Sequence, residues 1–129
     1  MADKWIQLQS ADGIDNLFPI GKVDLLWTNS SPSSGFTNQT VELDLSSYRF
    51  VYGLVAVVNS ASTLLYPLLL KVGAGSQYCF VSEGNARSYR TFRPTTTGIV
   101  ISSASTANFG NSVGTNNNYC IPEYFYGIR

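Results

Sequence analysis

The segment Asn116–Arg129, NNNYCIPEYFYGIR, decides the fold because an aromatic-rich pattern runs to the last residue of the sequence. Chain ends usually fray unless they pair as a strand or dock as a helix. This one carries too much apolar surface to remain in water, in Tyr119, Ile121, Tyr124, Phe125, Tyr126 and Ile128. We therefore predict a terminal strand with partners in a sheet. Pro122 cannot donate to the ladder, so this strand needs an edge position or a bulge there.

Both faces of this predicted strand carry large side chains. Tyr124, Tyr126 and Ile128 share one face, since neighbouring residues of a strand point to opposite sides. A single-chain sandwich buries only one face, whereas a neighbouring copy would cover the other and protect the sheet from aggregation. We predict that these three residues belong to an oligomer interface. Tyr126 and Ile128 should be buried against the second sheet or against a neighbouring chain.

Upstream segments show the patterns of further strands. TVELDLS (40–46) alternates apolar residues with two carboxylates and predicts a half-buried strand. The segment 48–60 is apolar on both parities, which predicts a central strand, with Gly53 marking a bulge or a close approach. Pro67 within 63–73 favours an edge strand.

Strand-like segments then recur about every ten residues, at 76–84, 86–95 and 97–105, without a helical period. A long polar loop, 106–118, is expected before the terminal strand. Regular short strands closed by turn residues are typical of a sandwich or jelly roll. We predict an all-β protein, an antiparallel, jelly-roll-like β-sandwich of about eight strands over residues 21–129. Residues 1–20 are expected to form a short extended arm or joint.

The charge composition argues against two classes of partner. Eight basic and eight acidic residues give a formal net charge of zero, and only 12% of residues are charged. Nucleic acids and anionic membranes require a basic excess. No apolar run reaches the ~18 residues of a membrane span, and the N-terminal residues lack the apolar region of a signal peptide. We expect neither nucleic-acid binding nor membrane insertion.

Few residues in the sequence point to catalysis. There is no histidine, the commonest general base near neutral pH. Two cysteines, Cys79 and Cys120, are too few for a disulfide framework or a zinc site and are expected to be free buried thiols. Glu42 and Asp44 are expected on a solvated strand face. We predict no metal, no cofactor and no enzyme activity. A depolymerase using Glu83 and Glu123 is the least favoured alternative.

Arginine and aromatic residues gather in one predicted strand, at Arg87, Tyr89, Arg90 and Arg93. Planar guanidinium groups beside aromatic faces suit a polar ligand such as a glycan or a teichoic-acid phosphate. The alternative is that the arginines pair with carboxylates of neighbouring strands, where each exposed pair contributes little.

Two loop aromatics are further candidates for ligand binding. Phe36 and Phe109 lie in loops rich in Ser, Thr, Gly and Asn, and binding residues concentrate in loops on a rigid scaffold. Both could instead fold back to cover one end of the sandwich. Trp27 is expected in the core or at its rim.

Residues 21–129 resemble the C-terminal head domains of tail, baseplate and receptor-binding proteins from siphophages and prophages of gut Gram-positive bacteria. The most specific segments are 26–29, 39–45 and 116–129, which carry LWTN, QTVELDL and NNNYCIPEYFYGIR. Cys120 stands where the family ending usually has leucine. Residues 123–125 replace a tyrosine, a polar residue and an isoleucine.

The resemblance implies a β-sandwich head, commonly a homotrimer, attached to other phage tail proteins and directed at host cell-wall saccharide. Such a protein is part of a virion or is prophage-encoded, and is made in the bacterial cytoplasm without a signal peptide. No catalytic residue comes with the resemblance. Two alternatives stay open, namely an assembly module with no ligand of its own and a carbohydrate-binding module of a bacterial enzyme.

Overall fold

The structure is a computed structural model and describes residues 23–58, 65–83, 86–108 and 114–129. The predicted arm 1–20 and Phe109 lie outside the described residues. Within them the regular structure is entirely antiparallel β, with no helix, so the predicted β-sandwich class is confirmed. The described part of the chain accordingly contains no helix long and apolar enough to cross a membrane.

Ten strands are present in the described residues, rather than about eight. They are β1 (Val23–Thr28), β2 (Gln39–Glu42), β3 (Phe50–Val58), β4 (Leu65–Lys71), β5 (Gln77–Glu83), β6 (Ala86–Thr95), β7 (Gly98–Ile101), β8 (Ser105–Asn108), β9 (Gly114–Thr115) and β10 (Tyr119–Ile128).

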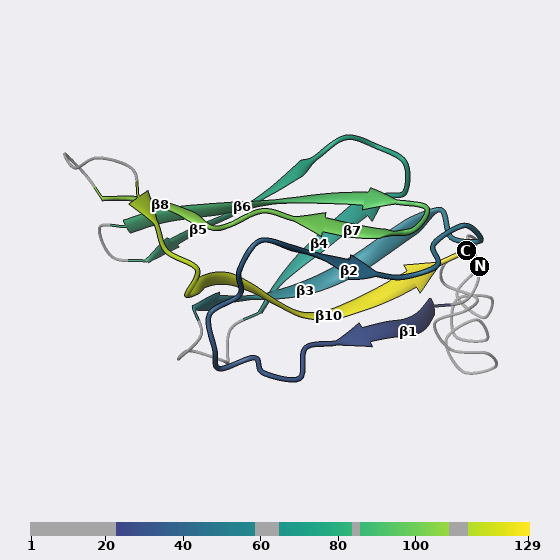
Figure 1. Cartoon of the computed structure of the whole chain (residues 1–129), viewed down its shortest axis with the longest axis horizontal. Coiled ribbons are helices and arrows are strands. Elements are labelled where there is room, and N and C mark those ends of the chain that lie inside the picture. The colour runs from purple at the N-terminus through teal and green to yellow at the C-terminus, as the bar shows by residue number, and fades with distance from the viewer. Residues whose placement is uncertain (1–22, 59–64, 84–85, 109–113) are drawn as a thin grey trace, which may run out of the picture.

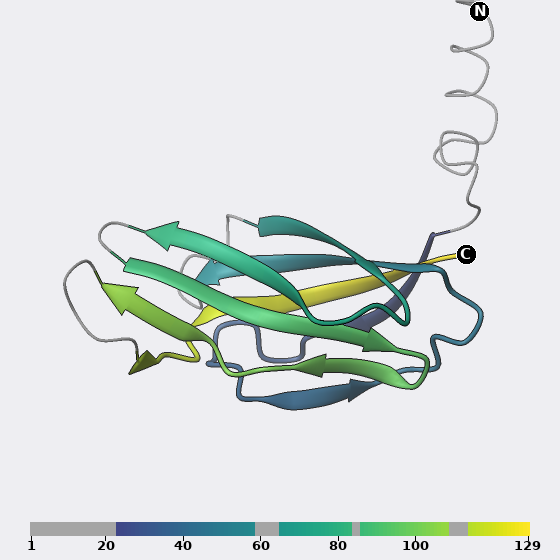
Figure 2. The ribbon, with the colours of Figure 1, turned by 90° about the horizontal axis from the view of Figure 1, so that it is seen from above.

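The strands form two sheets that lie face to face and run roughly along the long axis of the molecule (Figures 1 and 2). Sheet A has the order β1-β10-β3-β4. Sheet B has the order β2-β7-β6-β8-β9, and β5 also pairs with β6. The first strands pair with late ones, β1 with β10 and β2 with β7, which gives the jelly-roll-like wrapping. Other pairs join strands that are adjacent in sequence, as β3 with β4 and β5 with β6.

The terminal strand is a central strand of sheet A, which explains why the sequence stays apolar to its end. β10 lies between β1 and β3, so both of its edges are hydrogen-bonded. Its register with β3 shifts between Pro122 and Tyr124, which is the predicted irregularity at the proline. Gly53 of β3 faces the ring of Phe125, where an added Cβ would lie 3.2 Å from ring carbons. The predicted close approach at this glycine is confirmed.

Two segments differ from the sequence-based expectation. β2 ends at Glu42, because the backbone N–H groups of Leu43 and Leu45 bond instead to the carbonyl oxygens of Thr97 and Thr96 in the β6–β7 turn. The predicted loop 106–118 contains most of β8 and all of β9. The ten-residue β6 is paired with β7 only along its second half, which leaves its first half for β8. In contrast to these two segments, the prediction for Pro67 is confirmed, because it lies on β4, an edge strand of sheet A.

Candidate functional site

The side chains of β6 alternate between the core and the outer face of sheet B. Ser88, Arg90 and Phe92 are buried between the sheets. Arg87 and Arg93 are exposed on the opposite face, and Tyr89 between them is half-buried. The structure therefore brings three of the four predicted ligand-binding residues of this strand onto one outer face.

Tyr89 belongs to a cluster of three aromatic rings on this face, which we call the aromatic platform (Tyr78, Phe80 and Tyr89). The ring centroids of Tyr78 and Phe80 are 5.6 Å apart, and both lie within 6.0 Å of the Tyr89 centroid. Phe80 pairs directly with Tyr89 across β5 and β6. The exposed fraction is 57% for Tyr78 and 67% for Phe80. A contiguous patch of solvent-exposed aromatic rings usually marks a binding site for a ligand or a partner.

The surroundings of the aromatic platform are polar. Arg87 and Arg93 lie on β6 two and four residues from Tyr89, on the same face. Ser105 of β8 pairs with Tyr89 on the other side. Flat apolar rings next to guanidinium and hydroxyl groups can stack on the C–H face of a sugar while hydrogen-bonding its oxygens. This arrangement is suited to binding a polar ligand that has a flat apolar face.

Arg90 is a correction to the predicted patch. Its side chain is fully buried and points into the core, so it cannot touch a ligand on the outer face. The guanidinium donates hydrogen bonds to three backbone carbonyls, at 2.6 Å to Ser102, 3.0 Å to Tyr119 and 3.4 Å to Asn117. Burial lowers its pKa to about 10, which still leaves it charged at neutral pH. Arg90 therefore holds the turn before β10 against sheet B.

Phe36 also lies in the interior. This agrees with the alternative that the loop aromatics fold back to cover one end of the sandwich. It is 7% exposed, its ring lies edge-on to Trp27 with centroids 6.2 Å apart, and Arg90 sits 5.5 Å above it. The Trp27 ring in turn stacks on Phe125 at 5.2 Å. Phe36 closes one end of the sandwich and is not available to a surface ligand, so its predicted binding role is wrong.

The outer face of sheet A carries a second apolar surface, the apolar grid. Across β1, β10, β3 and β4, the residues Leu25, Tyr126, Tyr52 and Leu69 stand in one register row. The grid consists of Val23, Leu25, Phe50, Tyr52, Leu54, Pro67, Leu69, Tyr124, Tyr126 and Ile128.

The exposed fractions differ within the apolar grid. Leu25 is 57% and Leu69 58% exposed, whereas Tyr124 and Tyr126 are half-buried and Ile128 is 8% exposed in the single chain. The predicted interface residues of β10 therefore lie together on one outer face. The edges of the grid, rather than β10 itself, carry its most exposed side chains.

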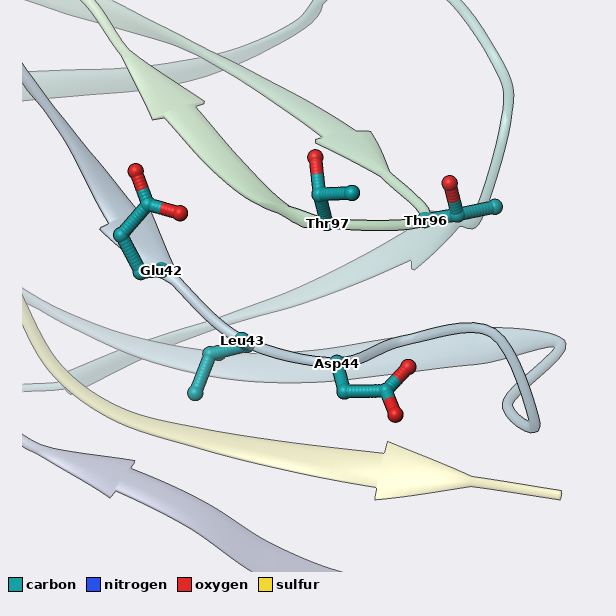
Figure 3. A pocket seen from close by; sticks show the side chains of 5 residues that line it. All are labelled: Glu42, Leu43, Asp44, Thr96 and Thr97. Carbon is teal, nitrogen blue, oxygen red and sulfur yellow. The ribbon is translucent and has the colours of Figure 1, made fainter.

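A shallow hollow of about 380 Å³ lies where β2 meets the β6–β7 turn and is lined by Glu42, Leu43, Asp44, Thr96 and Thr97. Its two carboxylates point in different directions (Figure 3). Asp44 accepts hydrogen bonds from the hydroxyl and backbone N–H of Ser46, which lower its pKa. The pair therefore does not converge on a common point, as two catalytic carboxylates must.

Of the two carboxylates weighed for a depolymerase, Glu83 ends β5, and Glu123 lies at the bulge of β10 and is 8% exposed. Burial raises its pKa. Among the described residues, no three His, Cys, Asp or Glu side chains are grouped so as to hold a metal ion.

Tyr78 and Phe80 were missed at the level of sequence, although a signal for them exists. Segment 76–84 has aromatic residues at alternate positions, Tyr78 and Phe80. Its last residue, Gly84, and the following Asn85 connect it to the arginine-bearing strand. A two-residue Gly-Asn connection favours a tight hairpin. Counting outward from that connection pairs Phe80 with Tyr89, as observed.

Comparisons of this chain with protein-family models, with curated proteins and with solved structures found no match.

Proposed function

We propose that this chain is a receptor-binding head of a phage or prophage tail, and that the aromatic platform recognises a saccharide of the host cell surface. The observation that carries the proposal is the platform itself, with Tyr78 and Phe80 more than half exposed on the outer face of sheet B. The tail context rests on the sequence resemblance of residues 21–129.

The chemistry of the platform favours a saccharide over a protein partner. Its exposed apolar surface is aromatic, and the described residues around it on this face are mostly polar, namely Arg87, Thr91, Arg93 and Ser105, with Ala107 and Val100 as the aliphatic exceptions. Stacked rings bind the flat C–H face of a pyranose, whereas protein-binding surfaces also recruit aliphatic side chains. Aliphatic residues such as Leu25 and Leu69 gather on the opposite sheet instead.

The proposed action is binding without catalysis. The sequence contains no histidine, and the carboxylates lining the hollow point apart (Figure 3). A platform of rings and guanidinium groups also needs no cofactor to hold a sugar.

Retention of the pure chain by isolated Gram-positive cell walls tests the proposal. The wild-type chain should be retained by at least one wall type. Phe80→Ala should lower its affinity about tenfold or more, since a stacked ring contributes ~0.5–1.5 kcal/mol in addition to its buried apolar area. Leu69→Ala is the matched control, because Leu69 is similarly exposed on the other sheet. Equal retention of the wild type and Phe80→Ala would refute the proposed site.

A second candidate function is an assembly module without a ligand, and the apolar grid favours it. An exposed sheet face of this kind is a docking surface for another copy of the chain or a neighbouring tail protein. The two functions are compatible, because the grid and the platform lie on opposite outer faces. A homotrimer packed through the apolar grid would leave all its platforms open.

A further inference from the structure

The two cysteines come from different sheets and meet in the core. Cys79 is an inward residue of β5 in sheet B, and Cys120 is the second residue of β10 in sheet A. Their exposed fractions are 2% and 0%. The Cys120 thiol donates to the backbone carbonyl oxygen of Cys79 at 3.7 Å. They are therefore adjacent across the interface of the two sheets.

The backbone of Cys120 has an unusual left-handed conformation. Its φ of 53° lies in the left-handed region, which non-glycine residues rarely adopt, and it is the only described non-glycine residue with positive φ. Such a conformation persists only where surrounding contacts hold it. Here the carbonyl of the preceding residue, Tyr119, accepts a 3.0 Å hydrogen bond from Arg90.

Arg90 also gives the thiol pair an electropositive environment. It pairs with Cys79 across β5 and β6, on the inner face, and its described hydrogen bonds all go to carbonyl oxygens. Its Nε has no hydrogen-bond partner among the described atoms. A guanidinium beside a cysteine favours the thiolate, which is the reactive form.

The two thiols are not equivalent. The neighbouring Cys120 thiol lowers the pKa of the Cys79 thiol, burial opposes this, and the charge of Arg90 lowers it further. Proximity to Cys79 and burial raise the pKa of Cys120. Because the Cys120 thiol donates its proton to the Cys79 carbonyl oxygen and Arg90 pairs with Cys79 across β5 and β6, we assign Cys79 as the nucleophile and Cys120 as its protonated neighbour.

We propose that Cys79 and Cys120 are an oxidation site, at which a peroxide converts the two free thiols to a disulfide that joins sheet A to sheet B. The Cys79 thiolate attacks one oxygen of hydrogen peroxide, breaking the O–O bond and leaving a sulfenic acid and hydroxide. The Cys120 sulfur then attacks the Cys79 sulfur, forming the S–S bond as the sulfenic oxygen leaves as water. In total, two thiols lose two electrons and one peroxide is reduced to two waters.

Access for a small oxidant comes from the position of β5. This strand pairs with β6 alone among the described strands, so it is an edge of sheet B. Edge strands open locally at lower free-energy cost than central ones. Opening of β5 would expose Cys79 while β10, held on both sides, keeps Cys120 in place.

The disulfide would strengthen the fold. Its cysteines are 41 positions apart, and a cross-link that closes a loop of this size restricts the unfolded chain. The midpoint of thermal unfolding should rise by about 10 °C. If the proposed function holds, the chain is made in the reducing cytoplasm with free thiols and would be cross-linked after release from the host. The chemistry itself does not depend on that function.

Intact-mass measurement of the pure chain tests the proposal. The chain is treated with hydrogen peroxide, denatured, and exposed to iodoacetamide. We expect the mass of one chain less two hydrogens, no alkylated cysteine, a tryptic peptide pair linking Cys79 to Cys120, and the higher unfolding midpoint. A reducing agent should restore the original mass and midpoint.

Three outcomes would overturn the proposal. These are two cysteines that both remain alkylatable, a disulfide that joins two chains, and sulfinic or sulfonic acids in place of the cross-link. In Cys79→Ala and Cys120→Ala, peroxide should not raise the unfolding midpoint, and a rise in either variant would also contradict the proposal. Wall retention measured on the same oxidised sample stays a separate result, so failure here leaves the saccharide site untouched.

Discussion

Arg90 shows how one residue can look like a ligand contact and act as a structural tie. It sits among Arg87, Tyr89 and Arg93 in sequence, but strand alternation turns it inward. There it gives hydrogen bonds to three backbone carbonyls, those of Ser102, Asn117 and Tyr119. The parity of Phe92, a clear core residue two positions later, already predicts that Arg90 faces inward.

Arg90→Ala should therefore destabilise the fold rather than remove a ligand contact. The loss of the guanidinium removes three hydrogen bonds and opens a cavity in the core, so we expect a cost of about 3 kcal/mol or more. Arg93→Ala, at an exposed position of the same strand, should change stability by less than about 0.5 kcal/mol. Urea unfolding of both variants gives the comparison, and equal stabilities would contradict the assigned role of Arg90.

Because of Glu123, at the bulge of β10, we expect the free energy of unfolding to depend on pH. Burial raises its pKa above the usual 4.5, and its Oε1 has no hydrogen-bond partner among the described atoms. The folded state therefore holds the proton more tightly than the unfolded state. The stability that this gives is fully present below the unfolded pKa and is lost as pH rises through the folded pKa.

Glu123→Gln should remove this pH dependence. At pH 7 the variant is expected to be more stable than the wild type by about 1 kcal/mol, because a neutral amide replaces a buried carboxylate. Near pH 4 the two should be nearly equal. Urea unfolding across this range measures the difference, and a difference that does not vary with pH would exclude Glu123 as its source.

Among the elements, β10 shows how far sequence patterns could predict the fold. Its existence follows from its apolar residues, and its proline predicted either an edge position or a bulge, of which the structure shows the bulge. Its central place in sheet A was not predicted. The end of β2 at Glu42 could not be predicted, because the next backbone groups bond to a turn more than fifty residues away in sequence. The short strands β8 and β9 were read as loop, since Ser, Asn and Gly dominate there.

Only part of the candidate site could be predicted, because sequence patterns show local strand parity but not the pairing between strands. The outward parity of Arg87, Tyr89 and Arg93 is a local property of β6. The aromatic platform is not, because it needs the pairing of Phe80 with Tyr89 across two strands. That pairing depends on hairpin register, and register is fixed by the length of the connection.

Gly127 provides a test of packing at the end of β10. A Cβ added there would lie 2.5 Å from a ring carbon of Tyr48 and 2.8 Å from a methyl carbon of Leu26. Gly127→Ala should therefore destabilise the protein by about 2 kcal/mol. Gly75 has nothing within 4 Å of such a Cβ, so Gly75→Ala should be neutral within about 0.5 kcal/mol in the same unfolding experiment. A neutral Gly127→Ala would mean that this contact is looser than described.

In the whole molecule, the two proposed functions, saccharide binding and association with other chains, use different outer faces. The two sheets lie face to face (Figure 2). The aromatic platform lies on the outer face of sheet B and the apolar grid on the outer face of sheet A. A head that packs against its copies through one sheet and presents the other to a cell surface uses both faces at once. The composition is consistent with this division, because a chain with no net charge needs its apolar surface covered by defined contacts.

The oligomer can be tested through the exposed ends of the grid. Light scattering should give the mass of three wild-type chains, and Leu25→Asn with Leu69→Asn should weaken association about tenfold or more by placing amides in an apolar contact. Tyr78→Asn, on the opposite sheet, should leave the mass unchanged. A wild-type monomer at high concentration would rule out a trimer through the apolar grid.

The central claim is that the outer face of sheet B holds the saccharide, and an NMR titration tests it most directly. Saccharide released from a wall that retains the chain is added to labelled protein, and backbone amide shifts are followed. The account predicts that the largest shifts fall on β5 and the first half of β6, around Tyr78, Phe80 and Tyr89. Shifts centred on sheet A, or no shifts at saturating saccharide, would contradict it.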